Sequence, residues 1–205
     1  MKQDTQMSKN FFIVLFFSLL LSWSSAFGRD KDLNDSLPVY SNLAAASDNP
    51  VLVLQLVLRK EKYTSFPKEI WEFSNLEFLD LSKNKLDSIP KKINLLKNLR
   101  VLKLSKNDIS SIPPELYELN NLEILVLSDN EMAYISPKVK KLVRLRKLDL
   151  WRTNVAVFPD EMSELAHLKI VDLRGVSLNR KQQDAASEVM PQAKVLFSPP
   201  CNCNL

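Results

Sequence analysis

Apolar residues of the leucine type recur along this chain every 23 positions without a slip. Three series keep this spacing: Val53, Leu76, Leu99, Leu122, Leu145 and Leu168; Leu56, Leu79, Leu102, Leu125, Leu148 and Val171; Leu58, Leu81, Leu104, Leu127, Leu150 and Leu173. A fixed period of this size is typical of a solenoid, whose repeats contact only their neighbours. No single repeat can bury its own apolar face, so stacked repeats must share one continuous core.

Each repeat has two halves with different periodicities. In the first half, Leu79 and Leu81 alternate with Phe78, Asp80 and Ser82, and this period of two predicts a short strand with its leucines inward. In the second half, a proline precedes apolar residues three positions apart, which predicts one face of a short helix or 3₁₀ turn. Those pairs are Ile70/Phe73, Ile93/Leu96, Leu116/Leu119, Val139/Leu142 and Met162/Leu165.

A polar residue stands at the sharp turn after the strand. It is Asn or Thr in four repeats: Asn84, Asn107, Asn130 and Thr153. An amide donates and accepts at once, so we expect each Asn to satisfy the backbone of its own turn and of the neighbouring repeat. Glu61 and Val176 replace it in the first and last repeats, which are expected to be atypical in a solenoid.

The pattern Leu-x-x-Leu-x-Leu-x-x-Asn-x-Leu-x-x-Ile-Pro, found from Leu76 to Pro90, closely resembles the leucine-rich repeat family. Its 23-residue period is similar to the Ras-suppressor-like subclass and to many bacterial members. The resemblance covers about residues 51–178. It implies an α/β solenoid of about six repeats with terminal caps, a curved parallel sheet on the concave face, and short helices or 3₁₀ turns on the convex face. It also implies protein binding, with no particular partner.

The first 26 residues have the layout of a secretory signal peptide: a basic start, the apolar run Phe11–Leu21, and small residues up to Ala26. We expect cleavage after Ala26 or after Gly28, and Met7 is an alternative start. The apolar run is shorter than the about 20 residues of a membrane-spanning helix. An uncleaved anchor is the alternative, and it is the one membrane association that the sequence suggests.

The repeats are flanked by shorter segments. Residues 27–50 are polar and include a short capping helix over 41–49, with Ser41 as its N-cap. Residues 179–197 are predicted to form the C-terminal cap, a helix from Asn179 to Met190 followed by a last strand. The tail, 198–205, contains both cysteines.

Cys201 and Cys203 offer two of the about four ligands that a structural zinc site needs, and nothing nearby supplies the others. We therefore expect no bound metal, and we expect a local disulfide or a bridge to another chain if the protein is exported. The alternative is that both cysteines are free thiols without a specific role. The Cys-rich caps of many animal and plant extracellular leucine-rich repeat proteins are missing, which favours a secreted protein of the bacterial type.

Catalysis is not indicated. The single His, His167, falls in a loop before a repeat, and the chain has no Gly-rich phosphate loop. We predict a protein that is not an enzyme and needs no cofactor. The 28 basic and 24 acidic residues interleave, with a net charge of +4, and this balance argues against a nucleic-acid partner.

Outward positions of neighbouring parallel strands lie about 4.8 Å apart and form columns across the repeats. One column has an apolar middle, unusual for a surface exposed to water: Gln55, Phe78, Val101, Ile124, Lys147 and Ile170. Trp151 belongs to another column, in which the three preceding repeats have serine. Trp and Arg often dominate the binding energy of interfaces, and exposed apolar clusters mark interaction sites.

These positions predict a concave binding patch of Trp151, Arg152, Arg174, Lys147, Asp149 and Asp172, flanked by Phe78, Val101 and Ile124. The alternative is that Trp151 only packs, flat on Arg174 or under the cap helix. We therefore predict an exported monomer, in the periplasm, on the cell surface or outside the cell, that binds another protein. A self-associating structural component of the envelope, and a cytoplasmic or membrane-anchored signalling scaffold, are the alternatives.

Overall fold

The computed structural model describes residues 34 and 36–200 of the chain. The predicted signal peptide, the start of the polar segment and the pair Cys201 and Cys203 lie outside the described residues. Within the described part, no helix is long and apolar enough to cross a membrane.

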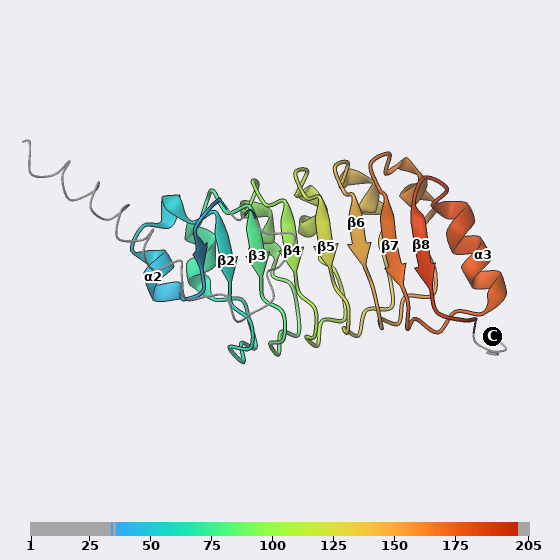
Figure 1. The fold of residues 1–205 in the computed structure, drawn as a ribbon, viewed down its shortest axis with the longest axis horizontal. Coiled ribbons are helices and arrows are strands. Elements are labelled where there is room, and N and C mark those ends of the chain that lie inside the picture. Colours follow the sequence, from blue (N-terminus) through green and yellow to red (C-terminus); the bar gives the residue numbers. More distant parts are fainter. Residues whose placement is uncertain (1–33, 35, 201–205) are drawn as a thin grey trace, which may run out of the picture. The chain divides into compact units, whose positions relative to one another are not determined.

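Eight parallel strands form one open, curved sheet in which every strand pairs with its neighbours in the chain (Figure 1). The strands are β1 (Val39–Tyr40), β2 (Gln55–Val57), β3 (Phe78–Asp80), β4 (Val101–Lys103), β5 (Ile124–Val126), β6 (Lys147–Asp149), β7 (Ile170–Leu173) and β8 (Lys194–Phe197). From β2 to β7 each residue pairs with the one 23 positions later, as Phe78 does with Val101. The repeat period therefore sets the register of the sheet, and the solenoid fold implied by the sequence is confirmed.

Short 3₁₀ helices lie between successive strands from β1 to β7. They are η2 (Pro50–Leu52), η3 (Lys68–Glu72), η4 (Lys91–Leu95), η5 (Pro114–Glu118), η6 (Pro137–Lys141) and η7 (Asp160–Glu164). Proline stands at the N-cap or first residue of each, because its fixed φ suits the entry to a helical turn.

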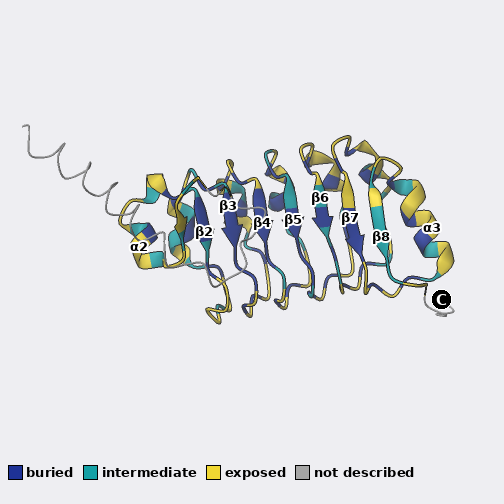
Figure 2. Cartoon of the chain, viewed as in Figure 1, coloured by how far each residue is buried: buried dark blue, intermediate teal, exposed yellow. Residues whose placement is uncertain are grey.

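The core is one continuous column between the strands and the 3₁₀ helices (Figure 2). The leucine positions of the three series, such as Leu79, Leu102 and Leu125, are at most 1% exposed. Each fully buried leucine contributes roughly 1.5–3 kcal/mol. Hydrophobic burial between repeats therefore dominates the stability of the fold.

The N-terminal end differs in detail from the expectation. The helix α2 (Leu43–Ser47) has Asn42 as its N-cap, whose side chain accepts from the N–H of Ala44 and Ala45, so the assignment of Ser41 was wrong. Residues 39–40 form the strand β1, parallel to β2, where the sequence suggested only a polar segment.

The predicted C-terminal helix and strand are both present. Helix α3 (Arg180–Val189) begins with a capping box in which Asn179 and Gln182 bond each other's backbone. Ala186 and Met190 are buried against the last repeat, and β8 pairs with β7. This cap covers the core where no further repeat follows.

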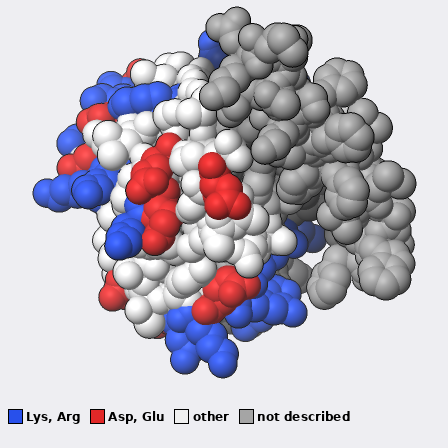
Figure 3. Space-filling model, turned by 90° about the vertical axis from the view of Figure 1, so that its left-hand side faces the viewer, with Lys and Arg blue, Asp and Glu red and all other residues white. Residues whose placement is uncertain are grey.

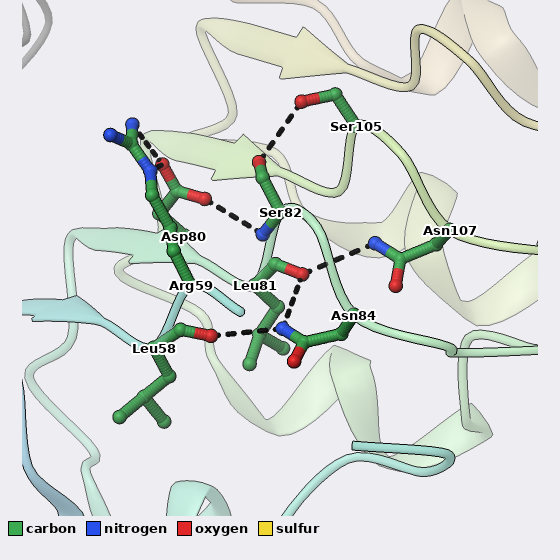
Figure 4. A network of polar contacts seen from close by, with 8 residues as sticks. All are labelled: Leu58, Arg59, Asp80, Leu81, Ser82, Asn84, Ser105 and Asn107. Carbon is green, nitrogen blue, oxygen red and sulfur yellow. Dashed lines mark hydrogen bonds and ion pairs between the residues drawn. The ribbon is translucent and has the colours of Figure 1, made fainter. Parts of the chain in front are cut away.

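Asn side chains join successive turns, and we call Asn84, Asn107, Asn130 and Thr153 the turn ladder. The amide of Asn107 donates to the carbonyl oxygen of Leu81 (3.1 Å), which also accepts from Asn84 (Figure 4). It donates as well to the carbonyl oxygen of Leu104 (2.8 Å) and accepts from the N–H of Leu86 (3.1 Å). Asn84 and Asn130 make equivalent bonds. The hydroxyl of Thr153 reaches only the carbonyl oxygen of Leu150 (2.8 Å).

Two further rows of side-chain contacts between repeats were not predicted from the sequence. The side-chain amides of Asn75, Asn98 and Asn121 each donate to a backbone carbonyl of the preceding repeat, at 2.8–3.0 Å. Charged side chains of alternating sign also line up, since Arg100 approaches Glu77 (3.6 Å) and Glu123 (2.9 Å). The 23-residue spacing of both sets was visible in the sequence and would have predicted them.

We expect Asn107→Ala to lower the free energy of unfolding by about 2–4 kcal/mol, because the N–H of Leu86 loses its partner and the carbonyl oxygens of Leu81 and Leu104 each lose one of two amide donors. Asn98→Ala is the matched control: its exposed amide makes one bond, and it should cost about 0.5–1.5 kcal/mol. Urea denaturation followed by circular dichroism measures both. Equal losses would contradict the role assigned to the turn ladder.

Candidate functional site

The concave surface is built from three columns of side chains. The strand register aligns Phe78, Val101, Ile124, Lys147 and Ile170 in one column, and Asp80, Lys103, Val126, Asp149 and Asp172 in a second. The third column lies two residues beyond the second, just after each strand ends: Ser82, Ser105, Ser128, Trp151 and Arg174. Accessible positions concentrate toward the C-terminal strands, since β3 and β4 are fully buried whereas β6, β7 and β8 are not (Figure 2).

Two strands bring most of the predicted patch together. Lys147 and Asp149 lie on β6, and Asp149 pairs in register with Asp172 on β7. Trp151 and Arg174 follow these strands and occupy adjacent positions of the third column, with Trp151 half-buried and Arg174 exposed. The patch is therefore a compact group around the ends of two neighbouring strands.

The two carboxylates of the patch differ in their partners. Asp172 accepts hydrogen bonds from the Arg174 backbone N–H (3.1 Å), Nε (3.0 Å) and Nη2 (2.6 Å). Asp149 accepts only from the backbone N–H of Trp151 (3.0 Å) and has no ion pair among the described residues. Asp149 is thus the carboxylate whose charge remains available to a partner.

These surroundings move the pKa values of the two groups in opposite directions. Burial, followed by the nearby charge of Asp172, raises the pKa of Asp149. Burial also acts on Asp172, but hydrogen bonds and charge from Arg174 outweigh it and lower the pKa of Asp172.

Trp151 is held by the turn that follows it. The guanidinium of Arg152 lies 5.1 Å from the Trp151 ring centroid, and Arg152 also pairs with Asp129 at 3.3 Å. Arg174 instead pairs with Asp172. Gly175 permits this packing, because a Cβ there would lie 2.6 Å from Cγ of Arg152.

The prediction placed Arg152 on the strand face, but in the structure Arg152 lies in the turn after β6. It belongs to a column of turn residues with positive φ: Lys60 (64°), Lys83 (62°), Lys106 (59°), Asp129 (52°), Arg152 (54°) and Gly175 (74°). The strands end before these positions because a left-handed residue cannot continue an extended strand.

The predicted apolar flank is largely inaccessible. Phe78 and Val101 are 2% and 8% exposed, and Ile124 is half-buried, so the expectation of a water-exposed flank was wrong for the first two. The ammonium of Lys103 lies 5.4 Å from the Phe78 ring centroid and contributes to this burial. Ile170, 39% exposed and paired with Lys147, is the accessible apolar neighbour that the predicted patch left out.

A cavity of about 270 Å³ lies beside the patch. Arg152, Asn154, Gly175 and Ser177 contribute to its lining, together with Thr153 and Val176 at the end of the turn ladder. The replacement of the ladder Asn by Thr153 and Val176 was visible in the sequence, and it was the available signal for this cavity.

Family models match two stretches of the chain: Leucine Rich Repeat at residues 75–96, and Leucine Rich repeats (2 copies) at residues 97–137. No curated protein sequence matches the chain. Residues 75–137 are therefore leucine-rich repeats by sequence as well as by fold.

Several solved structures are similar to the chain. The plant peptide hormone receptor RGFR1 in complex with RGF2 is 28% identical, with a TM-score of 0.53, over 65% of this chain and 22% of that one. The ectodomain of the receptor kinase GASSHO1/SCHENGEN3 from Arabidopsis thaliana, in complex with CASPARIAN STRIP INTEGRITY FACTOR 2, is 27% identical, with a TM-score of 0.53, over 73% and 23%. An internalin from Listeria monocytogenes (inlF) is 16% identical, with a TM-score of 0.57, over 82% and 55%, and shares the fold. The chain spans less than two thirds of each of these proteins.

The opposite pKa shifts predict opposite effects of two amide substitutions. At pH 7, Asp149→Asn should raise the unfolding temperature, because it removes a charge that burial and Asp172 disfavour. Asp172→Asn should lower it, because the stabilisation by Arg174, present above the ordinary pKa of Asp, is lost.

Thermal unfolding between pH 7 and pH 3 measures both effects. The gain in Asp149→Asn should shrink as the pH falls through the raised pKa of Asp149, where the native side chain becomes neutral. The deficit in Asp172→Asn should shrink as the pH falls through the lowered pKa of Asp172. Shifts of the same sign at pH 7 would refute the assignment of the two carboxylates.

Proposed function

We propose that this chain binds a protein or peptide through the concave face of its repeats, at the patch formed by Trp151, Arg152, Arg174, Lys147, Asp149 and Asp172. The observation that carries the proposal is the half-exposed Trp151 at a column position that serine occupies in the three preceding repeats. Nothing in the repeat fold requires an indole there, because Ser82, Ser105 and Ser128 meet the same backbone demands.

The chemistry of the patch suits a peptide that offers both charge and apolar surface. The Trp151 ring and Ile170 supply apolar area, and Lys147 and the unpaired Asp149 supply charges of both signs. Arg152 and Arg174 are already held by Asp129 and Asp172, so they are oriented before a partner arrives. Side chains that are already oriented lose less conformational entropy when the partner binds.

The comparisons support a binding role in general terms. Leucine-rich repeats in the two plant receptors above occur in complexes with RGF2 and CASPARIAN STRIP INTEGRITY FACTOR 2. The repeat fold is generally a binding scaffold rather than an enzyme. We propose, from the layout of residues 1–26, that the chain is exported and meets its partner in the periplasm, at the cell surface or outside the cell.

A self-associating envelope component is the second candidate. The strand β8 forms the free edge of the sheet, and its residues Val195, Leu196 and Phe197 are only half-buried. Open strand edges are templates for pairing with a second chain. Non-reducing gels and sedimentation of the full chain separate the candidates, since abundant dimers, disulfide-linked through Cys201 or Cys203 or paired through β8, are expected only from the second.

The test of the binding proposal uses the full chain as bait on native envelope and medium extracts. We expect the Trp151→Ala/Arg174→Ala double variant to lose the specific partner, with an affinity at least about 30-fold weaker once the partner is purified. The matched control is Leu95→Ala/Val143→Ala, which truncates two exposed apolar residues outside the strands. Capture by both variants alike, or by neither the variants nor the native bait, would reject the patch.

A further inference from the structure

We infer that the edge of the solenoid at repeats one to three is a binding site for a linear anionic polysaccharide. The inference rests on five lysines that follow the ends of β2, β3 and β4 and do not belong to the concave patch: Lys60, Lys62, Lys83, Lys85 and Lys106. We call them the lysine row. Figure 3, viewed from the N-terminal side of the repeats, shows basic side chains projecting at the lower edge, with acidic ones between them.

The lysine row is fixed by the backbone of the turns. Lys60, Lys83 and Lys106 occupy the same position of three successive repeats, and each backbone N–H donates to the next repeat, at 3.3 Å, 2.8 Å and 2.9 Å. Equivalent positions of neighbouring strands lie about 4.8 Å apart. The three residues therefore form a row of adjacent positions across the repeats.

The positive charges of the lysine row are not neutralised by ion pairs with the described residues. All five residues are exposed, and none of the five ammonium groups forms an ion pair in the part of the chain that the structure describes. This contrasts with Arg100, Lys140 and Arg152, which pair with glutamate or aspartate across repeats. Glu61, Asp87 and Asp108 lie among the lysines and reduce the positive charge without cancelling it.

The backbone conformation gives a second, independent argument. Lys60, Lys62, Lys83 and Lys106 all have positive φ, between 59° and 64°, where a β-carbon is crowded and glycine is favoured. The last repeat has Gly175, with a φ of 74°, at the position of Lys60, Lys83 and Lys106. Folding therefore does not require lysine at these positions, which Asp129 and Arg152 occupy with the same sign of φ in later repeats.

The charges around the lysine row favour a flexible linear polymer as the ligand over a flat membrane surface. Asp108, Asp129 and Glu131 follow directly on the same edge, and they would be pressed against an acidic membrane that lay flat on the lysines. A flexible linear polymer with a charge on each sugar can follow the lysine row and leave the surface before these carboxylates. Tyr63, beside Lys62, is half-buried, and the row itself contains no aromatic side chain on which nucleic-acid bases could stack.

The experiment measures binding of the full chain to a fluorescently labelled alginate oligosaccharide by anisotropy, across a series of salt concentrations. We expect Lys60→Gln/Lys83→Gln/Lys106→Gln to bind at least about tenfold more weakly at low salt, with a shallower salt dependence. Lys91→Gln/Lys92→Gln/Lys138→Gln removes the same charge from exposed positions on η4 and η6 and should bind within about twofold of the native chain.

A glycine version separates binding from folding. Lys60→Gly/Lys83→Gly/Lys106→Gly should lose binding to the same extent and unfold at the same or a higher temperature, because glycine suits the positive φ. No binding by the native chain, equal losses in the two glutamine variants, or binding to phosphatidylglycerol vesicles in place of alginate would overturn the inference. The concave patch contains none of these lysines, so failure here leaves the proposed function standing.

Discussion

In three repeats one Asn amide closes the turn after the strand: it accepts from a backbone N–H of the preceding repeat and donates to one carbonyl oxygen of each of the two repeats. Because one carbonyl belongs to the preceding repeat, the amide also fixes how far each repeat is rotated and shifted against the last. The buried leucines supply most of the free energy, but leucine contacts alone tolerate small slips. The Asn amides prevent such slips, and the columns on the surface depend on the fixed register that results.

A strict register has a consequence for function. Every outward position becomes a column with a spacing set by the sheet, so a change at one position of one repeat creates a local surface without disturbing the core. Trp151 in the serine column is a change of this kind, whereas Lys60, Lys83 and Lys106 repeat one residue type along the turn column. The strand ends at the C-terminal repeats offer an aromatic and charged surface, whereas the turns at the N-terminal repeats offer a row of ammonium groups.

The repeat period made the solenoid, its parallel register and the turn role of Asn107 predictable, because all three follow from spacing and from the bonds that an amide can make. The strand β1 was missed because Val39–Tyr40 is too short to show a periodicity. The burial of Phe78 and Val101 was missed because alternation tells which face a side chain occupies but not what lies over it. The pairing of Arg152 with Trp151 was missed because it depends on φ in the turn, which the strand pattern does not encode.

The end of the turn ladder coincides with the candidate patch. In repeat five, the side chain of Thr153 makes one hydrogen bond where Asn makes three. In repeat six, the side chain of Val176 has no polar group, and the backbone N–H of Val155 finds no acceptor among the described residues. A cavity beside these positions is lined in part by Arg152 and Gly175, and the missing Cβ of Gly175 leaves room for the side chain of Arg152. Arg152 keeps the positive φ of the turn column there, and its guanidinium lies 5.1 Å from the Trp151 ring centroid. The repeats in which the turn ladder makes fewer bonds are therefore the repeats that carry the candidate patch, and β5, β6 and β7 keep their register without it.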